Sequence, residues 1–460
     1  MLKNHSTGDT ICAIATANAP AGIGIVRISG PTAIIIAKTL FLPKKPLDWS
    51  HLRGYTMTYG QIGQTGRAGN ESIDETICLV FLSPRSYTGE DVVELQCHGG
   101  LLVLRRVLDA VLAAGARLAE PGEFTHRAFL NGRMDLSQAE AVMQLISAQS
   151  AQALRAARCA MGGALSRRIA ELRAQLIAQS AHISAWADYP DEDILSVDTG
   201  ELAQVVVQVQ QNLRQLLSRA AADRVMISGV RTVLLGKPNV GKSSLMNRFA
   251  GYDRSIVTEL PGTTRDTITE SVPLGDLTLC LTDTAGLRET THPAEQAGVV
   301  RSRDAMAAAD LLLLVTDASR PLDEADRVIL SQCDPARTIL VRNKADLRDL
   351  QQTADFPWSV AVSAQTGQGM DVLAQAAQTL LGANHFSPEE ALLANQRQTQ
   401  CVAQASAALD EVLAALRDGF ALDAVSICLE DAIQALFSLT GERATEAVVD
   451  EVFTHFCVGK

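Results

Sequence analysis

A phosphate-binding loop is the clearest chemical signal in the sequence. Residues 236–243 read GKPNVGKS and lie between a strand-like run, TVLLG, and a helix-like run, SSLMNRFA. In this G-x-x-x-x-G-K-S pattern, backbone N–H groups and a helix N-terminus surround phosphate oxygens. Lys242 would supply positive charge to the β and γ phosphates, and the Ser243 hydroxyl would bind magnesium. The other nucleotide-binding candidates in this loop are Asn239, Val240, Gly241 and Ser244.

Two further motifs predict the base. NKAD at 343–346 follows the run TILVR, and SAQTG at 363–367 follows another strand-like run. The Asp346 carboxylate can accept from the ring N–H and the exocyclic amine of guanine, a pair of donors that adenine lacks. Asn343 can bridge the base edge and the loop, and the Ala364 N–H can donate to the guanine carbonyl oxygen. A site built on such bonds rejects the wrong ligand strongly, so GTP is favoured over ATP. The base-site candidates are Asn343, Lys344, Asp346, Ser363 and Ala364.

The magnesium side is predicted from DTAG at 283–286 and TELPGTTRD at 258–266. Asp283 ends a strand-like run and can hold the ion through water, and Thr264 is the candidate for the switch threonine on magnesium. The Gly286 N–H can face the γ phosphate. The candidates in the DTAG loop are Asp283, Thr284, Ala285 and Gly286.

The residue after DTAG raises a question about hydrolysis. Ras-type GTPases carry a glutamine there, which orients the attacking water. This chain has Leu287, and a leucine side chain can neither polarise nor orient water. Another group must therefore handle the water.

The elements that position these motifs form three regions. Residues 1–134 mix short strand-like runs with a helix and predict an α+β domain. Residues 135–228 and 383–460 show helical periodicity and predict one all-α domain interrupted by an insertion. The insertion, 229–382, alternates helices with near-continuous apolar runs, which suit a parallel sheet covered on both faces. We therefore expect a multidomain chain with an inserted α/β P-loop GTPase domain of the Ras-like kind.

Composition limits the choice of partners. The chain has 40 Lys and Arg against 52 Asp and Glu, a formal charge of −12, so nucleic acid would need a local basic face. Residues 153–175 offer one, with a solvated helix face as the alternative reading. Its arginines are Arg155, Arg158, Arg167, Arg168 and Arg173.

Location follows from what the sequence lacks. Its nine cysteines are scattered, which argues against a disulfide framework or zinc site and fits a reducing compartment. No apolar run approaches the ~18–20 residues that span a bilayer, and the first residues lack the apolar core of a signal peptide. We expect a cytoplasmic protein that does not contact a membrane.

The chain resembles the MnmE/TrmE-type tRNA-modification GTPases over essentially its whole length. The GTPase motifs alone occur in many translational GTPases. The N-terminal stretches together with the last five residues are far more specific to this family. The matching stretches are GIGIVRISG (22–30), YTGEDVVELQCHGG (87–100), PGEFTHRAFLNGRMDLSQAEA (121–141), YPDED (189–193), KPNVGKSSLMN (237–247), TELPGTTRDT (258–267), DTAGLRET (283–290) and FCVGK (456–460).

The resemblance implies how water is handled without the glutamine. In this family a potassium ion assists hydrolysis, and Asn239 matches its asparagine ligand. Glu295 matches the catalytic glutamate, which can act as a base directly or through a bridging water. From the residues alone, Glu295 is read as a first-turn glutamate complementing a helix dipole. The remaining potassium ligands implied by the family are Thr258, Leu260 and Thr263.

The resemblance also implies that the N-terminal domain dimerises and binds a tetrahydrofolate, as the 5-formyl or 5,10-methylene derivative. Arg27, Glu94 and Lys460 match the folate-binding positions. Arg133 stands where lysine is common, which keeps the charge but changes reach and geometry. Cys457 is a candidate catalytic residue, because a thiol in the tail could reach a one-carbon unit, and the alternative is a small residue that packs the last helix onto a neighbour.

The implied function is a homodimeric, potassium-assisted GTPase that forms a hetero-oligomer with a flavin-dependent partner of the MnmG (GidA) type. Together they would add a carboxymethylaminomethyl or aminomethyl group to carbon-5 of the wobble uridine of certain tRNAs, using a folate one-carbon unit. One alternative is a regulatory GTP switch that binds the ribosome or tRNA without modification chemistry. Another is a folate-dependent transferase that works alone.

Overall fold

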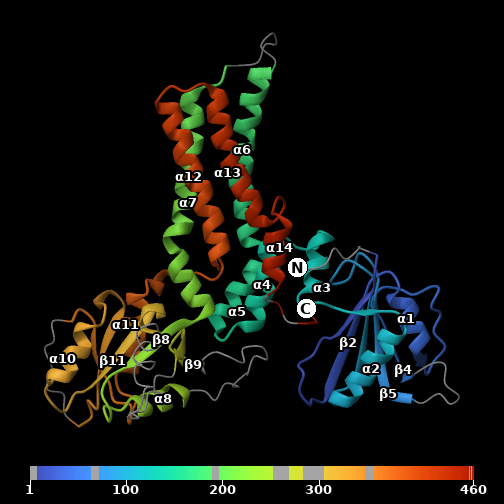
Figure 1. Cartoon of the computed structure of the whole chain (residues 1–460), viewed down its shortest axis with the longest axis horizontal. Coiled ribbons are helices and arrows are strands. Elements are labelled where there is room, and N and C mark those ends of the chain that lie inside the picture. Colours follow the sequence, from blue (N-terminus) through green and yellow to red (C-terminus); the bar gives the residue numbers. More distant parts are fainter. Residues whose placement is uncertain are drawn as a thin grey trace, which may run out of the picture. The chain divides into compact units, whose positions relative to one another are not determined.

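The structure is a computed structural model of the chain, shown in Figure 1. Its contacts divide the chain into two compact units, and each is described by itself. The first is Met1–Met143 with Phe437–Lys460, and the second is Gln144–Leu436. The residues that the structure describes are 8–63, 72–188, 196–251, 269–282, 305–347, 356–454, 456, 458 and 459.

The N-terminal unit is built on a seven-stranded sheet in the order β3-β4-β5-β6-β2-β1-β7. Neighbouring strands are antiparallel except β1 and β7, which are parallel. The strands are β1 (Ile11–Ile14), β2 (Ile23–Ser29), β3 (Phe41–Pro43), β4 (Thr56–Gly63), β5 (Ser72–Phe81), β6 (Val92–His98) and β7 (Arg117–Leu118).

Two helices, α1 (Ala33–Leu40) and α2 (Leu101–Ala113), cover one face of this sheet. Apolar side chains of α2 three and four residues apart, such as Leu104 and Val107, lie in one core with strand residues such as Val26. Because successive strand residues face opposite sides, every second strand residue enters this core. The predicted α+β architecture is confirmed.

Within the N-terminal unit, an apolar cluster packs the C-terminal segment against residues from the first part of the chain. It packs α14 (Glu446–Thr454) against α3 (Glu123–Leu130) and the start of α4 (Leu136–Ser147). The rings of Phe453 and Phe456 lie 5.1 Å apart within it. These last residues fall in the helical domain predicted at 383–460, whereas their contacts group them with the N-terminal unit.

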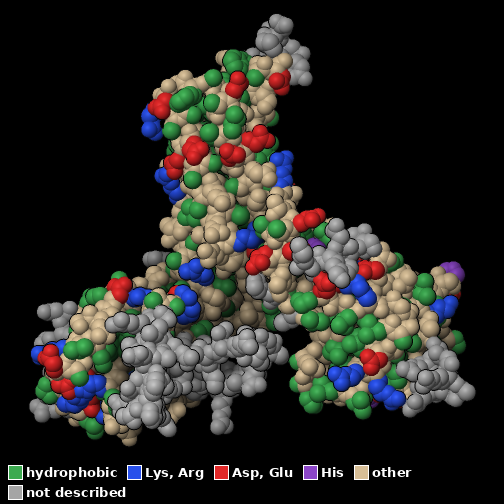
Figure 2. Space-filling view, viewed as in Figure 1, with side chains coloured by type: hydrophobic (Ala, Val, Ile, Leu, Met, Phe, Trp, Pro, Cys, Tyr) green, Lys and Arg blue, Asp and Glu red, His purple; other side chains and the backbone are tan. Residues whose placement is uncertain are grey.

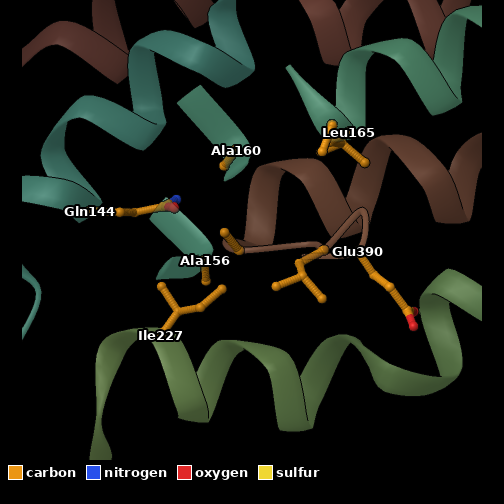
Figure 3. A pocket seen from close by; sticks show the side chains of 9 residues that line it. Gln144, Ala156, Ala160, Leu165, Ile227 and Glu390 are labelled. Atoms are coloured by element: carbon orange, nitrogen blue, oxygen red, sulfur yellow. The ribbon is translucent and has the colours of Figure 1, made fainter. Parts of the chain in front are cut away.

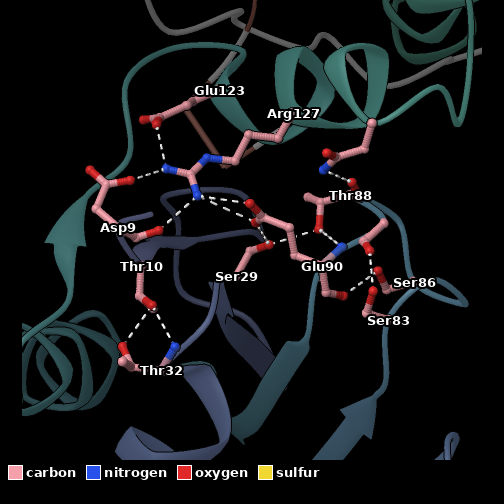
Figure 4. A network of polar contacts seen from close by, with 12 residues as sticks. Asp9, Thr10, Ser29, Thr32, Ser83, Ser86, Thr88, Glu90, Glu123 and Arg127 are labelled. Carbon is pink, nitrogen blue, oxygen red and sulfur yellow. Dashed lines mark hydrogen bonds and ion pairs between the residues drawn. The ribbon is translucent and has the colours of Figure 1, made fainter. Parts of the chain in front are cut away.

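A buried polar network, drawn in Figure 4, holds the loops of this unit. Arg127 pairs with Asp9 at 2.5 Å and with Glu90 at 3.1 Å. Glu123 accepts from Arg117 at 2.5 Å and from Arg127 at 3.0 Å. Burial alone would raise the pKa of the Asp9 and Glu123 carboxyls, but the arginine hydrogen bonds outweigh it and lower both pKa values. The carboxylates are therefore held ionised. The network joins the segments that contain Asp9, Glu90 and Arg117 to the helix α3.

The second unit contains long helices. Asp198 caps the first turn of α7 by accepting from the N–H groups of Gly200 and Glu201. Helices α7 and α12 lie side by side, and an exposed ion pair joins Arg214 of α7 to Asp410 of α12 at 2.8 Å. Among the described residues, no helix has the length and apolarity to cross a membrane. The helices are α5 (Ala151–Met161), α6 (Ala164–Asp188), α7 (Thr199–Ser228), α12 (Gln396–Arg417) and α13 (Leu422–Thr440).

The inserted domain has a six-stranded sheet in the order β13-β12-β11-β8-β10-β9. All neighbours are parallel except β9 and β10. The strands are β8 (Val230–Leu235), β9 (Thr269–Leu274), β10 (Leu277–Thr282), β11 (Leu311–Asp317), β12 (Thr338–Asn343) and β13 (Ser359–Ala361), and the helices described are α8 (Lys242–Ala250), α10 (Glu324–Ser331) and α11 (Met370–Leu380).

Helices cover both faces of this parallel sheet. Phe249 of α8 and Leu373 of α11 pack on one face, and Ile329 of α10 packs on the other. The whole of β11 is buried, as its apolar run predicted. The strand order reverses at β8, and in such sheets ligands bind beyond the carboxyl ends of the strands at the reversal.

The insertion leaves and returns at neighbouring points of the helical region. It begins directly after α7, at Gly229. At its end, a side chain on Gly382 would lie 4.0 Å from the Cβ of Ala222 in α7. Both connections of the inserted domain therefore meet the same end of α7.

A small cavity lies where α5, α6 and α7 meet the segment before α12 (Figure 3). Mostly apolar side chains such as Leu165 and Ile227 line it. Gln144 also lines it, and its Oε1 atom is buried with no hydrogen-bond partner among the described residues. The space suits about one water molecule, which would satisfy that oxygen. It is a packing cavity and not a ligand site.

Candidate nucleotide-binding site

The phosphate loop joins β8 to α8 at the reversal point of the sheet. A Cβ on Gly236 would lie 2.2 Å from the carbonyl oxygen of Val315 in β11. Gly241 is the N-cap of α8 with φ 94°, and a Cβ there would lie 2.2 Å from Nδ2 of Asn343. Only glycine fits these two approaches, so the motif glycines are needed for the loop to close on its neighbours.

Lys242 turns back into this loop. Its Nζ donates to the carbonyl oxygens of Gly236 and, at 2.8 Å, of Lys237. Burial lowers the pKa of the Lys242 ammonium group. Ser243 and Ser244 are exposed in the first turn of α8, where helix N–H groups lack intrahelical partners. Phosphate oxygens can replace the two carbonyls and stabilise the ammonium charge.

Asn343 connects the phosphate loop to the SAQTG loop. It ends β12 and is almost fully buried. Its Nδ2 donates to the Val240 carbonyl oxygen at 3.0 Å, and its Oδ1 accepts from the Ala364 N–H at 3.0 Å. The structure therefore places Asn343 between two predicted nucleotide-binding loops. Contact of the Ala364 N–H with a guanine carbonyl oxygen stays a prediction.

The rest of the NKAD and SAQTG motifs lies at the same edge. Lys344 donates to the Asn239 carbonyl oxygen at 3.0 Å and to Asp317 at 2.6 Å. Burial alone would raise the pKa of the Asp317 carboxyl, but the hydrogen bonds from Lys344 and Ser319 together outweigh it, so the pKa lies below its ordinary value. Ser363 is buried, and its hydroxyl accepts from a backbone N–H within its own loop. Asp346 is exposed, so its carboxylate is accessible to a base.

Most of the predicted hydrolytic residues lie outside the described residues. Strand β10 ends at Thr282, which pairs with Val233 of β8, the strand that leads into the phosphate loop. The roles of the following residues stay predictions: Thr258, Leu260, Thr263, Thr264, Asp283, Thr284, Ala285, Gly286 and Glu295.

In the N-terminal unit, the structure brings together two predicted folate-binding residues. Arg27 of β2 lies opposite Glu94 of β6, and its Nε donates to the Glu94 carboxylate at 2.8 Å. Its Nη1 donates to the Gly459 carbonyl oxygen at 3.4 Å, so the chain end reaches this pair. The guanidinium also lies 5.5 Å from the Tyr87 ring and 5.6 Å from the Phe124 ring.

For the other predicted folate-site residues, the structure gives no contact with the Arg27–Glu94 pair within the part of the chain that it describes. Arg133 is exposed, and its stem lies beside Gly89. Cys457 and Lys460 lie outside the described residues. Tyr87 and Phe124 carry no sequence pattern that marks them as site residues, although both occur in the family-matching stretches at 87–100 and 121–141. Those stretches were the available signal.

Comparison with known proteins agrees with the geometry. The family model described as "GTP-binding protein TrmE N-terminus" matches residues 10–133, and "MnmE helical domain" matches residues 136–457. The tRNA modification GTPase MnmE of Symbiobacterium thermophilum is 44% identical. The proteins of the same name from Geobacter sulfurreducens and Acetivibrio thermocellus are 43% and 39% identical. Each similarity covers 98% of this chain and 99% of the relative. A phosphate loop on a P-loop fold and similarity along the whole length agree: the chain belongs to the MnmE family of tRNA modification GTPases.

Proposed function

We propose that this GTPase acts with magnesium, potassium, a reduced folate and a flavin-dependent partner to modify carbon-5 of the wobble uridine of tRNA. One observation carries the proposal: the same chain holds a phosphate loop and, in a separate unit, an Arg27–Glu94 pair beside its own C-terminal Gly459. The first feature suits GTP, and the second suits a ligand with both anionic groups and N–H donors, as a folate has.

Magnesium would be held by hard oxygen donors around the phosphates. The exposed Ser243 hydroxyl follows Lys242 in the first turn of α8, and Thr264 with Asp283 would complete the site. Hydroxyl, carboxylate and phosphate oxygens are the ligands that this ion prefers. When bound, the ion would neutralise charge that develops on the phosphates.

Potassium would be held by side-chain and backbone oxygens of the phosphate loop and the segment 258–263, and would supply positive charge during hydrolysis. Asn239 supports this site, because it is exposed in the loop and has φ 65°. Its backbone is fixed by Lys344, which donates to its carbonyl oxygen at 3.0 Å. Its exposed side-chain oxygen would bind the ion, with Thr258, Leu260 and Thr263 as further ligands.

We expect GTP turnover to rise when potassium chloride replaces sodium chloride at equal ionic strength. A cation at the place of an arginine finger, which is worth about 10³–10⁵ in rate, would give an increase on the order of tenfold or more. Phosphate release under saturating GTP measures it. Asn239→Ala should abolish the difference between the salts. Equal rates in both salts for the unchanged protein would remove the ion-assisted mechanism.

The folate would bind at the Arg27–Glu94 pair. Each of these side chains is only 15% exposed, and the guanidinium is flanked by two aromatic rings. We expect Arg27→Ala to weaken binding of 5-formyltetrahydrofolate by about 10- to 100-fold, because a charge-assisted hydrogen bond is worth about 1.5–3 kcal/mol. Calorimetry measures the affinity, and GTP turnover should not change. If the unaltered protein binds no reduced folate, the regulatory-switch alternative is favoured.

A second copy of the chain would cover the open face of the N-terminal sheet. Hydrophobic side chains reach the surface of this unit (Figure 2). On the strand face opposite α1 and α2, Met57 is 69% exposed, and Ile23 and Tyr59 are also exposed. Such a face buries apolar area when two sheets meet. Sedimentation of the purified chain should show a dimer, and a monomer would argue against this interface.

The tRNA and the flavin-dependent partner complete the proposal. Arg155, Arg158 and Arg167 on α5 and α6 are the basic face available to RNA phosphates, and a solvated face is the alternative. Nucleoside analysis of tRNA from cells lacking the chain tests the function: the aminomethyl-type wobble uridine should disappear. Unchanged tRNA would favour the switch. Reconstitution with and without a flavoprotein separates the partnered enzyme from a transferase that works alone.

A further inference from the structure

Arg248 lies in the last turn of α8 and contacts a loop from far along the chain. Its Nε donates to the Ala364 carbonyl oxygen at 2.8 Å, and its Nη2 donates to the Gln365 carbonyl oxygen. Both acceptors are backbone atoms of the SAQTG loop. Because the guanidinium holds its donors in a rigid planar fork, two such bonds fix the position and the orientation of the loop backbone at Ala364.

These bonds close a path that links the predicted nucleotide-binding loops. The Ala364 N–H donates to Asn343 Oδ1, and Asn343 Nδ2 donates to the Val240 carbonyl oxygen, both at 3.0 Å. Val240 belongs to the phosphate loop, which continues into α8 and so back to Arg248. Hydrogen bonds thus connect the phosphate loop, the NKAD motif and the SAQTG loop. Arg248 provides the connection from α8 to Ala364 and Gln365 of the SAQTG loop.

The simpler alternative is that Arg248 only stabilises the end of α8 by its charge. A cation in the last turn of a helix compensates the partial negative charge of the helix C-terminus. That role needs a charge near the end of α8. It does not need two directed bonds to consecutive carbonyls of a loop more than a hundred residues away. A lysine satisfies the first role but lacks the fork that the second requires.

We propose that Arg248 is a positioning residue for guanine recognition: it holds the SAQTG loop so that the Ala364 N–H reads the oxygen on carbon-6 of the base. Asp346 reads the ring N–H and the amine separately, from a loop that Arg248 does not contact in the described residues. This inference depends on the proposed contact of Ala364 with the base. It predicts that loss of the arginine relaxes selectivity at carbon-6 and leaves selectivity at the amine unchanged.

The test compares three nucleotides on the full chain with magnesium. 6-Thio-GTP differs from GTP in the atom on carbon-6 and keeps both donors for Asp346, whereas ITP lacks the amine. For Arg248→Ala we expect the preference for GTP over 6-thio-GTP to fall about three- to tenfold, the usual worth of one neutral hydrogen bond. The preference for GTP over ITP should not change. Dissociation constants from displacement of a fluorescent GDP give both ratios.

Two further variants separate positioning from charge and from general stability. Arg248→Lys should lose selectivity at carbon-6 as the alanine variant does, and a wild-type ratio would support the helix-charge reading. Arg337 is the matched control, because its Nη1 donates to the carbonyl oxygens of Ala307 and Ala309, at 3.1 and 3.0 Å, away from the SAQTG loop. Arg337→Ala should lower the melting temperature and leave both nucleotide ratios unchanged.

Two results would overturn the inference, and they differ. If the unaltered chain prefers GTP over 6-thio-GTP and Arg248→Ala keeps that preference, Arg248 does not position the loop. If the unaltered chain binds both nucleotides equally, the Ala364 contact itself is wrong and the inference fails with it. In that case the binding of GTP, and its preference over ITP, would be unaffected.

Discussion

Replacing Asp346 with asparagine is expected to move the nucleotide preference from GTP to XTP. The carboxylate accepts from the ring N–H and the exocyclic amine of guanine, whereas an amide presents its own N–H₂ group to that amine. Xanthine carries a carbonyl oxygen in place of the amine, and the asparagine can donate to it. Because a site built on hydrogen bonds rejects an unmatched ligand by about 10⁴–10⁵, the ratio of the two affinities should change by about 10⁴. Dissociation constants of both nucleotides measure it.

Asp317 provides the control for this experiment. It lies at the same edge of the sheet and pairs with Lys344 of the same motif at 2.6 Å, but it has no predicted contact with the base. Asp317→Asn should weaken both nucleotides to a similar extent and keep the preference for GTP. An Asp346→Asn variant that still prefers GTP by the original ratio would show that another group reads the base.

The second large effect is expected for Glu295→Ala. Leu287 cannot orient water, so the hydrolytic step depends on another group, and general-base catalysis contributes about 10²–10⁴ in rate. We expect turnover to fall by that factor while the affinity for GTP stays near its original value, because Glu295 is not among the predicted phosphate or base contacts. Single-turnover hydrolysis and nucleotide titration separate the two quantities.

A nearby acid tests whether the effect is specific. Glu289 belongs to the same segment, and Glu289→Ala should hydrolyse GTP at close to the original rate. If Glu295→Ala also retains its turnover, the residue returns to the simpler reading of a glutamate in the first turn of a helix.

The inserted domain could be predicted well from the sequence because its signals are local. A strand buried on both faces is apolar along most of its length, so the run LLLLV of β11 identifies a parallel strand without knowledge of its partners. Edge strands lack this signal. Strand β9, TESVPL, has no continuous apolar run and carries Pro273 at the edge of the sheet. Strand β4 also lacks a clear signal, because Met57 and Tyr59 are large apolar or aromatic residues that lie exposed on the face away from the core.

The parts of the site that depend on distant pairing could not be predicted from the residues alone. Arg27 meets Glu94 because β2 and β6 pair in one particular register, and a shift by one residue would move every side chain to the other face. The contacts of Arg248 could not be predicted for the same reason, because nothing in the sequence around an arginine near a helix end indicates which distant carbonyls accept its hydrogen bonds. Helical periodicity likewise gave α14 an apolar face but not the partner that covers it.

The adjacent connections of the inserted domain have a thermodynamic consequence for the helices that carry it. If the insertion unfolded, it would become a long flexible loop between α7 and α12, and closing such a loop costs on the order of 4 kcal/mol in chain entropy. The folded insertion removes most of that cost, because Gly229 follows α7 directly and Gly382 lies beside Ala222 of the same helix. A nucleotide that stabilises the folded insertion therefore also protects the α7–α12 pair from melting, without touching either helix.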